Sequence, residues 1–66
     1  MNVVINGETT EVSDGSTIST LLIQFNLLNE RIAVEQNGNI IRKESFESTF
    51  LSQGDTIEIV RFVGGG

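Results

Sequence analysis

The sequence predicts an α+β roll, in which a mixed sheet of four to five strands packs against one helix. Three observations lead to this fold class. Two segments with strand character, one alternating and one a short apolar run, are each followed by an Asn-Gly pair, at 6–7 and 37–38, which is typical of tight β-hairpin turns. One amphipathic stretch lies between these hairpins, and the strongest strand pattern comes near the end of the chain. A single helix among several strands is expected to cover one face of a sheet.

The first hairpin is predicted over residues 1–12. In its first strand, residues 1–6, every second side chain from Met1 onward is apolar, which is the period of a half-buried strand. Asn6-Gly7 forms the turn, because a type I′ turn needs positive φ at both central positions. The return strand, residues 8–12, is expected to turn Thr10 and Val12 inward.

The helix is predicted over residues 17–26. One helical face carries the apolar residues Ile18, Leu21, Leu22 and Phe25 at positions i, i+3, i+4 and i+7. Ser16 is the expected N-cap, and Ser19 stands where a capping box would have Glu or Gln, so no full box is expected. Ile23 lies off the apolar face and is expected to be exposed.

The second hairpin joins short strands at 32–35 and 40–41. Residues 42–44 form a mixed-charge cluster that we interpret as a solvated turn rather than a contact with a partner. Phe46, Phe50 and Leu51 are expected to anchor an irregular segment or a single 3₁₀ turn to the core.

The last strand is predicted over residues 56–63. If Ile57 and Ile59 face the helix, then Val60 and Phe62 face away from it. Val4 of the first strand would share that outer face, where the three apolar side chains would form a docking surface. The alternative is that a loop covers them. If the first and last strands pair at the centre of the sheet, they run parallel.

The composition excludes several classes of function. The chain has no cysteine and no histidine, so it lacks a disulfide scaffold, a Cys-based metal site, a thiol nucleophile and the usual general base. We therefore expect no self-contained enzyme and no metal site. A net charge of −5 argues against nucleic acid as a partner. No apolar run approaches about 18 residues, so we expect no membrane association and a cytoplasmic location.

The most distinctive stretch is the glycine tail. We divide the chain into a folded domain, residues 1–63, and a flexible tail of Gly64, Gly65 and Gly66. Three residues without Cβ atoms can place the terminal carboxylate up to roughly 10 Å beyond the fold. Such a tail fits a narrow channel in another protein, and we hypothesise that the carboxylate of Gly66 is the reactive group.

Together these features resemble the ubiquitin-like β-grasp family, and within it the ThiS family of sulfur carrier proteins of thiamine biosynthesis. The resemblance runs the whole length of the chain. It rests on the Asn-Gly-Glu hairpin at 6–8, the helix pattern, the segment 33–38 and the ending GDTIEIVRFVGGG. The ending is the specific part, because a bare Gly-Gly terminus is a weak signal.

The resemblance implies chemistry at Gly66. A ThiF-type enzyme would adenylate its carboxylate with ATP and Mg, and sulfur from a cysteine desulfurase persulfide would convert it to a thiocarboxylate. A ThiG-type thiazole synthase would then accept the sulfur. Gly64 and Gly65 would thread the partner channel, while Val4, Val60 and Phe62 would dock. The carrier itself would bind no cofactor.

Three other interpretations remain open. The small subunit of molybdopterin synthase uses the same chemistry, although the short length and the Gly-Gly-Gly end favour thiamine. A ubiquitin-like modifier would be conjugated to lysines instead. A plain interaction domain would carry the glycines only as flexible filler.

Overall fold

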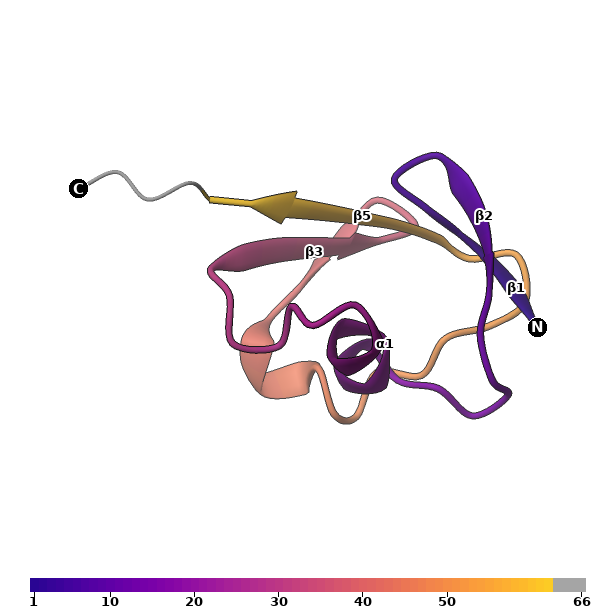
Figure 1. Ribbon diagram of the computed structural model, residues 1–66, viewed down its shortest axis with the longest axis horizontal. Helices are drawn as coiled ribbons and strands as arrows, with labels where there is room; N and C mark the ends of the chain where they lie inside the picture. The colour runs from indigo at the N-terminus through magenta and orange to yellow at the C-terminus, as the bar shows by residue number, and fades with distance from the viewer. Residues whose placement is uncertain (63–66) are drawn as a thin grey trace.

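The computed structural model describes residues 1–62 and confirms the predicted α+β architecture. Five strands form one mixed sheet, and the single helix among these residues lies against one face of it (Figure 1). The elements are β1 (Asn2–Ile5), β2 (Glu8–Glu11), α1 (Ile18–Gln24), β3 (Ile32–Gln36), β4 (Asn39–Ile41), a 3₁₀ turn (Lys43–Ser45) and β5 (Thr56–Arg61). The predicted strand end at Val63 and the predicted tail, Gly64 to Gly66, lie outside the described residues.

The sheet order is β2-β1-β5-β3-β4. The two strands farthest apart in sequence, β1 and β5, pair in parallel near its centre, as expected, and the other neighbours are antiparallel. Both predicted hairpin turns are present. Asn6 and Gly7 have φ angles of 48° and 84°, and Asn37 and Gly38 have 51° and 85°, so each turn has the positive φ values that type I′ requires.

The core lies between the inner face of the sheet and α1. Val3, Val34 and Ile57 from three strands are fully buried, and Ile18, Leu21 and Leu22 of α1 pack over them. The cluster is completed by Ile5, Val12, Phe46 and Leu51. The sequence therefore predicted most of the core correctly, because a two-residue strand period and a helical period both place these side chains on inward faces.

Two aromatic residues do not join the core, contrary to expectation. Phe25 is 41% exposed, because α1 ends at Gln24 and Phe25 is its C-cap, which takes the side chain off the helical face. Phe50 is 63% exposed. Its segment is anchored by backbone instead, since its carbonyl accepts a hydrogen bond from Gln36 Nε2 at 3.1 Å and its backbone forms a bridge with Thr17.

The start of the helix also differs from the prediction. Thr17, not Ser16, is the N-cap. A capping box is present after all, because the Thr20 N–H donates to Thr17 Oγ1 at 3.2 Å and the Thr17 N–H donates to Thr20 Oγ1 at 2.8 Å. A threonine hydroxyl thus performs the reciprocal role that Glu or Gln usually has at this position.

The segment that follows β4 covers the start of α1. The first helical N–H groups have no partners within a helix and need acceptors from elsewhere. Here Ile18 N–H donates to the Thr49 carbonyl at 3.0 Å, and Ser19 N–H donates to the Phe46 carbonyl at 3.0 Å. This backbone pairing explains why a segment with little regular structure is well packed.

Candidate functional site

The candidate site is the end of β5 and the outer face of the sheet around it. In Figure 1, β5 crosses the middle of the sheet between β1 and β3 and points away from the body of the molecule. Its last described residue, Phe62, is tied to the start of β3, because its N–H donates to the Arg31 carbonyl at 2.9 Å. The predicted reactive residue Gly66, and Gly64 and Gly65 before it, lie beyond these residues.

The predicted apolar residues of the outer face are open. Val60 is 53% exposed and Phe62 is 58% exposed, so no loop among residues 1–62 covers them. They alternate with the buried Ile57 and the half-buried Ile59, and so face away from the helix as expected. Val4 is half-buried on the same side. The register places Ala33 opposite Val60 and so extends this apolar surface onto β3. We call Val4, Ala33, Val60 and Phe62 the outer patch.

Two glutamates lie next to the outer patch. Glu35 of β3 and Glu58 of β5 are direct cross-strand partners on the outer face. Neither forms an ion pair within residues 1–62. Like charges placed directly opposite each other destabilise a sheet, so this pair costs stability without a visible structural return.

Asn6 holds the later half of β5 in place. The β1–β5 ladder contains only two residue pairs, but the Asn6 side chain continues it. Its Oδ1 accepts from the Ile59 N–H at 2.8 Å, and its Nδ2 donates to the Ile59 carbonyl at 3.2 Å. The side-chain amide therefore replaces a missing backbone peptide beside the strand that leads to the tail.

Asp55 fastens the turn before β5. Its buried carboxylate accepts hydrogen bonds from Gln36 Nε2 at 3.0 Å, Asn37 Nδ2 at 2.9 Å and the Ser52 N–H at 2.8 Å. Burial by itself would raise the pKa of Asp55, but the hydrogen bonds from Asn37, Ser52 and Gln36 outweigh it and hold the pKa below its ordinary value of 3.8. In the sequence, this aspartate stands out only through its place in the Gly54-Asp55 pair directly before the last strand.

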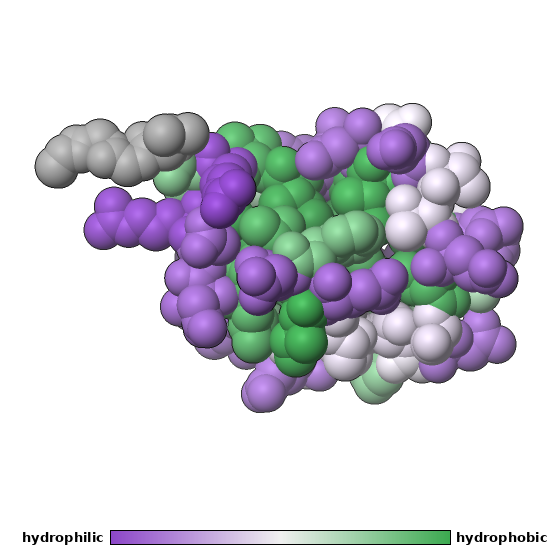
Figure 2. Space-filling model, viewed as in Figure 1, coloured by the Kyte–Doolittle hydropathy of each residue, from purple (hydrophilic) through white to green (hydrophobic). Residues whose placement is uncertain are grey.

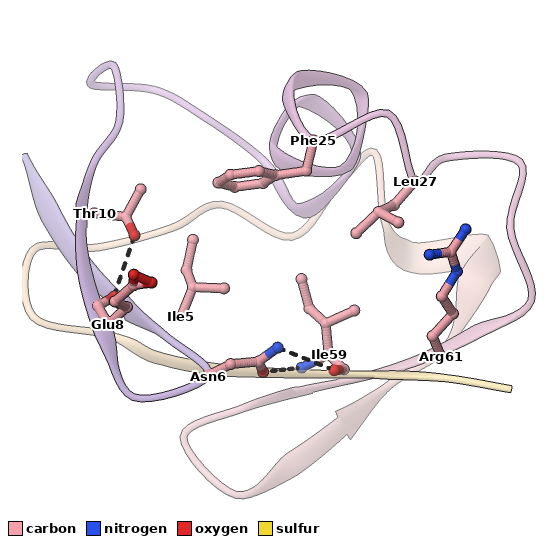
Figure 3. A pocket seen from close by; sticks show the side chains of 8 residues that line it. All are labelled: Ile5, Asn6, Glu8, Thr10, Phe25, Leu27, Ile59 and Arg61. Carbon is pink, nitrogen blue, oxygen red and sulfur yellow. Dashed lines mark hydrogen bonds between the residues drawn. The ribbon is translucent and has the colours of Figure 1, made fainter.

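An open cleft of about 420 Å³ lies between the first hairpin, the end of α1 and β5 (Figure 3). The apolar side chains that line it are Ile5, Phe25, Leu27 and Ile59. The polar ones are Asn6, Glu8, Thr10 and Arg61. Figure 2 shows hydrophobic surface in this part of the molecule, surrounded by hydrophilic residues. The sequence could not reveal the cleft, because it predicted Phe25 as part of the core.

The described residues contain little reactive chemistry of their own. Within residues 1–62, no group of three or more His, Cys, Asp or Glu side chains is arranged to hold a metal ion. The same residues include no helix with the length and apolar character needed to cross a membrane. Around the end of β5 they expose the apolar side chains of Val60 and Phe62.

Comparisons with known proteins identify the family. The model of the ThiS family matches residues 3–66. The sulfur carrier protein ThiS of Bacillus subtilis strain 168 is 47% identical over 53 residues, which are 80% of each chain. A thiazole synthase of Paramagnetospirillum magneticum is 39% identical over all 66 residues of this chain, which spans only 20% of that relative.

A solved structure agrees with this assignment. The crystal structure of the thiamine biosynthesis protein ThiS from Geobacter metallireducens matches with a TM-score of 0.85 and 30% identity, and 100% of each chain is covered. Its likeness extends over the whole sheet and helix described above. The chain therefore belongs to the ThiS family of sulfur carrier proteins, which have a ubiquitin-like β-grasp fold and are associated with thiamine biosynthesis.

Proposed function

We propose that the protein carries sulfur as a thiocarboxylate at Gly66 and donates it to the formation of the thiazole ring of thiamine. The observation that carries the proposal is the extent of the family match, which runs to residue 66 and so includes the glycine tail. The position of β5 supports it, because the strand that precedes the tail is held in the sheet on both sides and the outer patch beside it is exposed.

The proposed first step is activation of the carboxylate. An α-carboxyl group has a pKa of about 3.3–3.7, so it is ionised at neutral pH and is a poor acyl donor. In the adenylating partner, a ThiF-type enzyme using Mg and ATP, a carboxylate oxygen of Gly66 attacks the α-phosphorus. A P–O bond forms, pyrophosphate leaves, and the acyl group becomes an adenylate.

The second step exchanges oxygen for sulfur. The terminal sulfur of a protein persulfide, supplied by a cysteine desulfurase, attacks the acyl carbon and AMP leaves. A thiol then cleaves the S–S bond of the acyl disulfide, so the thiol sulfurs are oxidised to a disulfide and Gly66 is left as a thiocarboxylate. Transfer of this sulfur to an acceptor breaks the acyl C–S bond, and an oxygen from water or from the acceptor takes its place, which regenerates the carboxylate.

The acceptor that we propose is a thiazole synthase of the ThiG type. The support is that two proteins named thiazole synthase, from Paramagnetospirillum magneticum and Magnetococcus marinus, match this chain over 66 residues at 39% and 33% identity. The carrier would bind no cofactor, and ATP and Mg would belong to the activating partner. Its own contribution would be recognition and delivery of the acyl group.

Intact-mass spectrometry tests the modification. The untreated protein should first be shown to end at Gly66. After incubation with ATP, Mg, a persulfide donor, a reducing thiol and the cognate adenylating enzyme, the mass should rise by about 16 Da, because sulfur replaces one oxygen of a covalent terminal group. A protein that is adenylated but never gains this mass would contradict the sulfur-carrier proposal.

A substitution in the tail tests whether adenylation requires a residue without a side chain next to Gly66. Gly65→Val adds a branched side chain next to the reacting residue, so we expect adenylation, measured as ATP–pyrophosphate exchange, to be abolished while thermal unfolding is unchanged. Gly64→Ala, one position nearer the fold, is the matched control and should retain most of the exchange. Normal exchange by the Gly65→Val variant would refute the proposal that the tail enters a narrow channel in the adenylating enzyme.

A further inference from the structure

We propose that a basic groove at the end of β5 binds a carboxylate-bearing, partly apolar segment at the mouth of the adenylating partner's channel. The inference rests on the proposed function and adds the chemistry of the contact that guides the tail. The basic groove is an open depression of about 480 Å³ beside the last described residues of β5. Its lining residues are Asn29, Glu30, Arg31, Ile32, Lys43 and Phe62.

The groove lies where positive charge is concentrated. The chain has a net charge of −5 and only four basic residues, and all four lie near this end of the sheet. Arg61 is paired with Ile32 at the start of β3, and Arg31 precedes the same strand. Arg42 and Lys43 directly follow β4, whose last residue lies opposite the middle of β3. All four basic residues of this acidic protein therefore lie toward the end of the sheet that leads to the tail, together with Glu30, which lines the groove, and Glu44, which follows Lys43.

Two of these cations line the basic groove and are available to a partner; Arg42 is likewise exposed and forms no ion pair within residues 1–62, but it does not line the groove. Arg61 is not available, because its guanidinium is hydrogen-bonded to the Glu30 carboxylate, with Nε at 3.0 Å from Oε1. Arg31 and Lys43 are exposed and form no ion pair within residues 1–62. Both line the basic groove, where they flank the half-buried Ile32 and the exposed Phe62.

Charge complementarity determines the occupant. Positive side chains beside an exposed aromatic ring fit a segment in which Asp or Glu stands next to an apolar residue, because the carboxylate meets the cations and the apolar group covers Phe62. The four residues from 63 to 66 can span at most about 14 Å. When the tail enters the channel, the basic groove therefore faces the channel mouth, which is where the acidic segment should lie.

The outer face adds a second, opposite charge. Glu35 and Glu58 lie farther from the end of β5 than the basic groove does, with Val60 between them and Phe62 along the strand. A partner that presents acid at the channel mouth and a base farther away would match both charges in one orientation only. Reversed docking would bring like charges together, which is unfavourable. This arrangement of positive and negative side chains thus favours the docking orientation in which the tail enters the channel.

The test compares binding with catalysis in the full-length carrier. In Arg31→Gln/Lys43→Gln, we expect the Kd for the cognate adenylating enzyme to rise about tenfold or more at low ionic strength, and its salt dependence to weaken. The rate of ATP–pyrophosphate exchange at saturating carrier should stay near the wild-type value, because the groove does not touch the reacting atoms. Thermal unfolding should be unchanged, since neither side chain makes a hydrogen bond among the described residues.

Two control variants separate local contact from overall charge. Ser13→Asp/Gln24→Glu makes the same change in net charge at exposed positions away from both the basic groove and the outer patch, and it should alter Kd less than twofold. Arg31→Lys/Lys43→Arg keeps both charges and should bind like the wild type. Equal weakening by the remote variant, or no weakening by the groove variant, would overturn the proposal.

The remaining outcomes identify other occupants. A second copy of this acidic chain would give a concentration-dependent dimer in sedimentation that the groove variant abolishes, and ATP alone would give calorimetric binding to the isolated carrier. Either result would overturn the assignment to a partner segment. Failure of the proposed function is distinguishable, because the wild-type protein itself would then support no exchange at any concentration.

Discussion

Asp55 is the clearest case of a single residue on which a larger segment depends. One buried carboxylate holds the side chains of Gln36 and Asn37 and the backbone of Ser52, so it links the β3–β4 turn to the loop before β5. Asn37 in turn accepts from the Thr56 N–H at 2.9 Å, at the first residue of β5. The start of the tail-bearing strand is therefore positioned by this small network.

Replacing Asp55 by Asn should destabilise the fold by about 1–3 kcal/mol near neutral pH, because one acceptor becomes a donor and buried partners lose their bonds. The pKa of Asp55 is lowered in the folded state, so its contribution is present above the unfolded value and is lost as pH falls through the folded value. The difference between wild type and Asp55→Asn should be constant above about pH 5 and shrink below about pH 4.

Urea denaturation at several pH values measures this difference. Asp14→Asn is the matched control, because Asp14 is 91% exposed and pairs only with the terminal ammonium group. It should change stability by less than about 1 kcal/mol. If the difference in unfolding free energy between wild type and Asp55→Asn stayed constant down to pH 2, the role of the ionised Asp55 carboxylate as a hydrogen-bond acceptor would be contradicted.

At the scale of elements, the attachment of β5 to β1 depends on the Asn6 side chain as well as on backbone pairing. Asn6→Gly removes the side chain but keeps a residue that tolerates the φ of 48° found there. Loss of the two hydrogen bonds to Ile59 should lower stability by about 1–2 kcal/mol and accelerate hydrogen exchange at the Ile59 amide. NMR-detected exchange measures the second effect residue by residue.

Asn26→Gly is the control for this prediction. Asn26 also has a positive φ, 61°, but its side chain makes no hydrogen bond among the described residues. Both variants therefore share any entropic effect of introducing glycine. Only Asn6→Gly should accelerate hydrogen exchange at the Ile59 amide. Asn6→Asp keeps the oxygen that accepts from Ile59 and should protect that amide more than Asn6→Gly does. Unchanged protection in Asn6→Gly would show that backbone pairing alone holds β5.

At the scale of the whole molecule, the two faces of the sheet have different roles. The inner face is covered by α1 and supplies the core, whereas none of the four outer-patch residues belongs to the core cluster. Substitutions there should therefore separate folding from recognition. Because the inner face alone supplies the core, the domain can fold while Val60 and Phe62 stay exposed on its central strand.

Val60→Thr/Phe62→Ser should leave thermal unfolding within a few degrees of wild type but weaken binding to the adenylating enzyme by tenfold or more, because exposed apolar residues at the centre of an interface carry much of its energy. Calorimetric titration measures the change. Ile23→Thr is the control, since Ile23 is also 58% exposed but lies on α1 and should leave binding unaltered. If the control weakens binding equally, docking uses the helical side instead.

Much of this fold could be predicted because the deciding interactions are local. The positive φ of Asn-Gly pairs, the two-residue strand period and the helical spacing are readable from neighbouring residues, and they placed the hairpins, α1 and the inner side of β5 correctly. The errors at Ser16, Phe25 and Phe50 have two causes. The first two depended on where the helix begins and ends, and the third on a backbone contact with a distant segment.

The sequence by itself determined the pairing of turns with strands, the apolar core and the presence of a glycine tail after a strand, because each follows from residue types and their spacing. Only the tertiary structure decided that Asn6 clamps Ile59, that Asp55 ties two turns together and that Arg31 and Lys43 share a groove with Phe62. These contacts join residues that are distant along the chain. They exist because the parallel pairing of β1 with β5 and the antiparallel pairing of β3 with β5 bring remote segments to one strand.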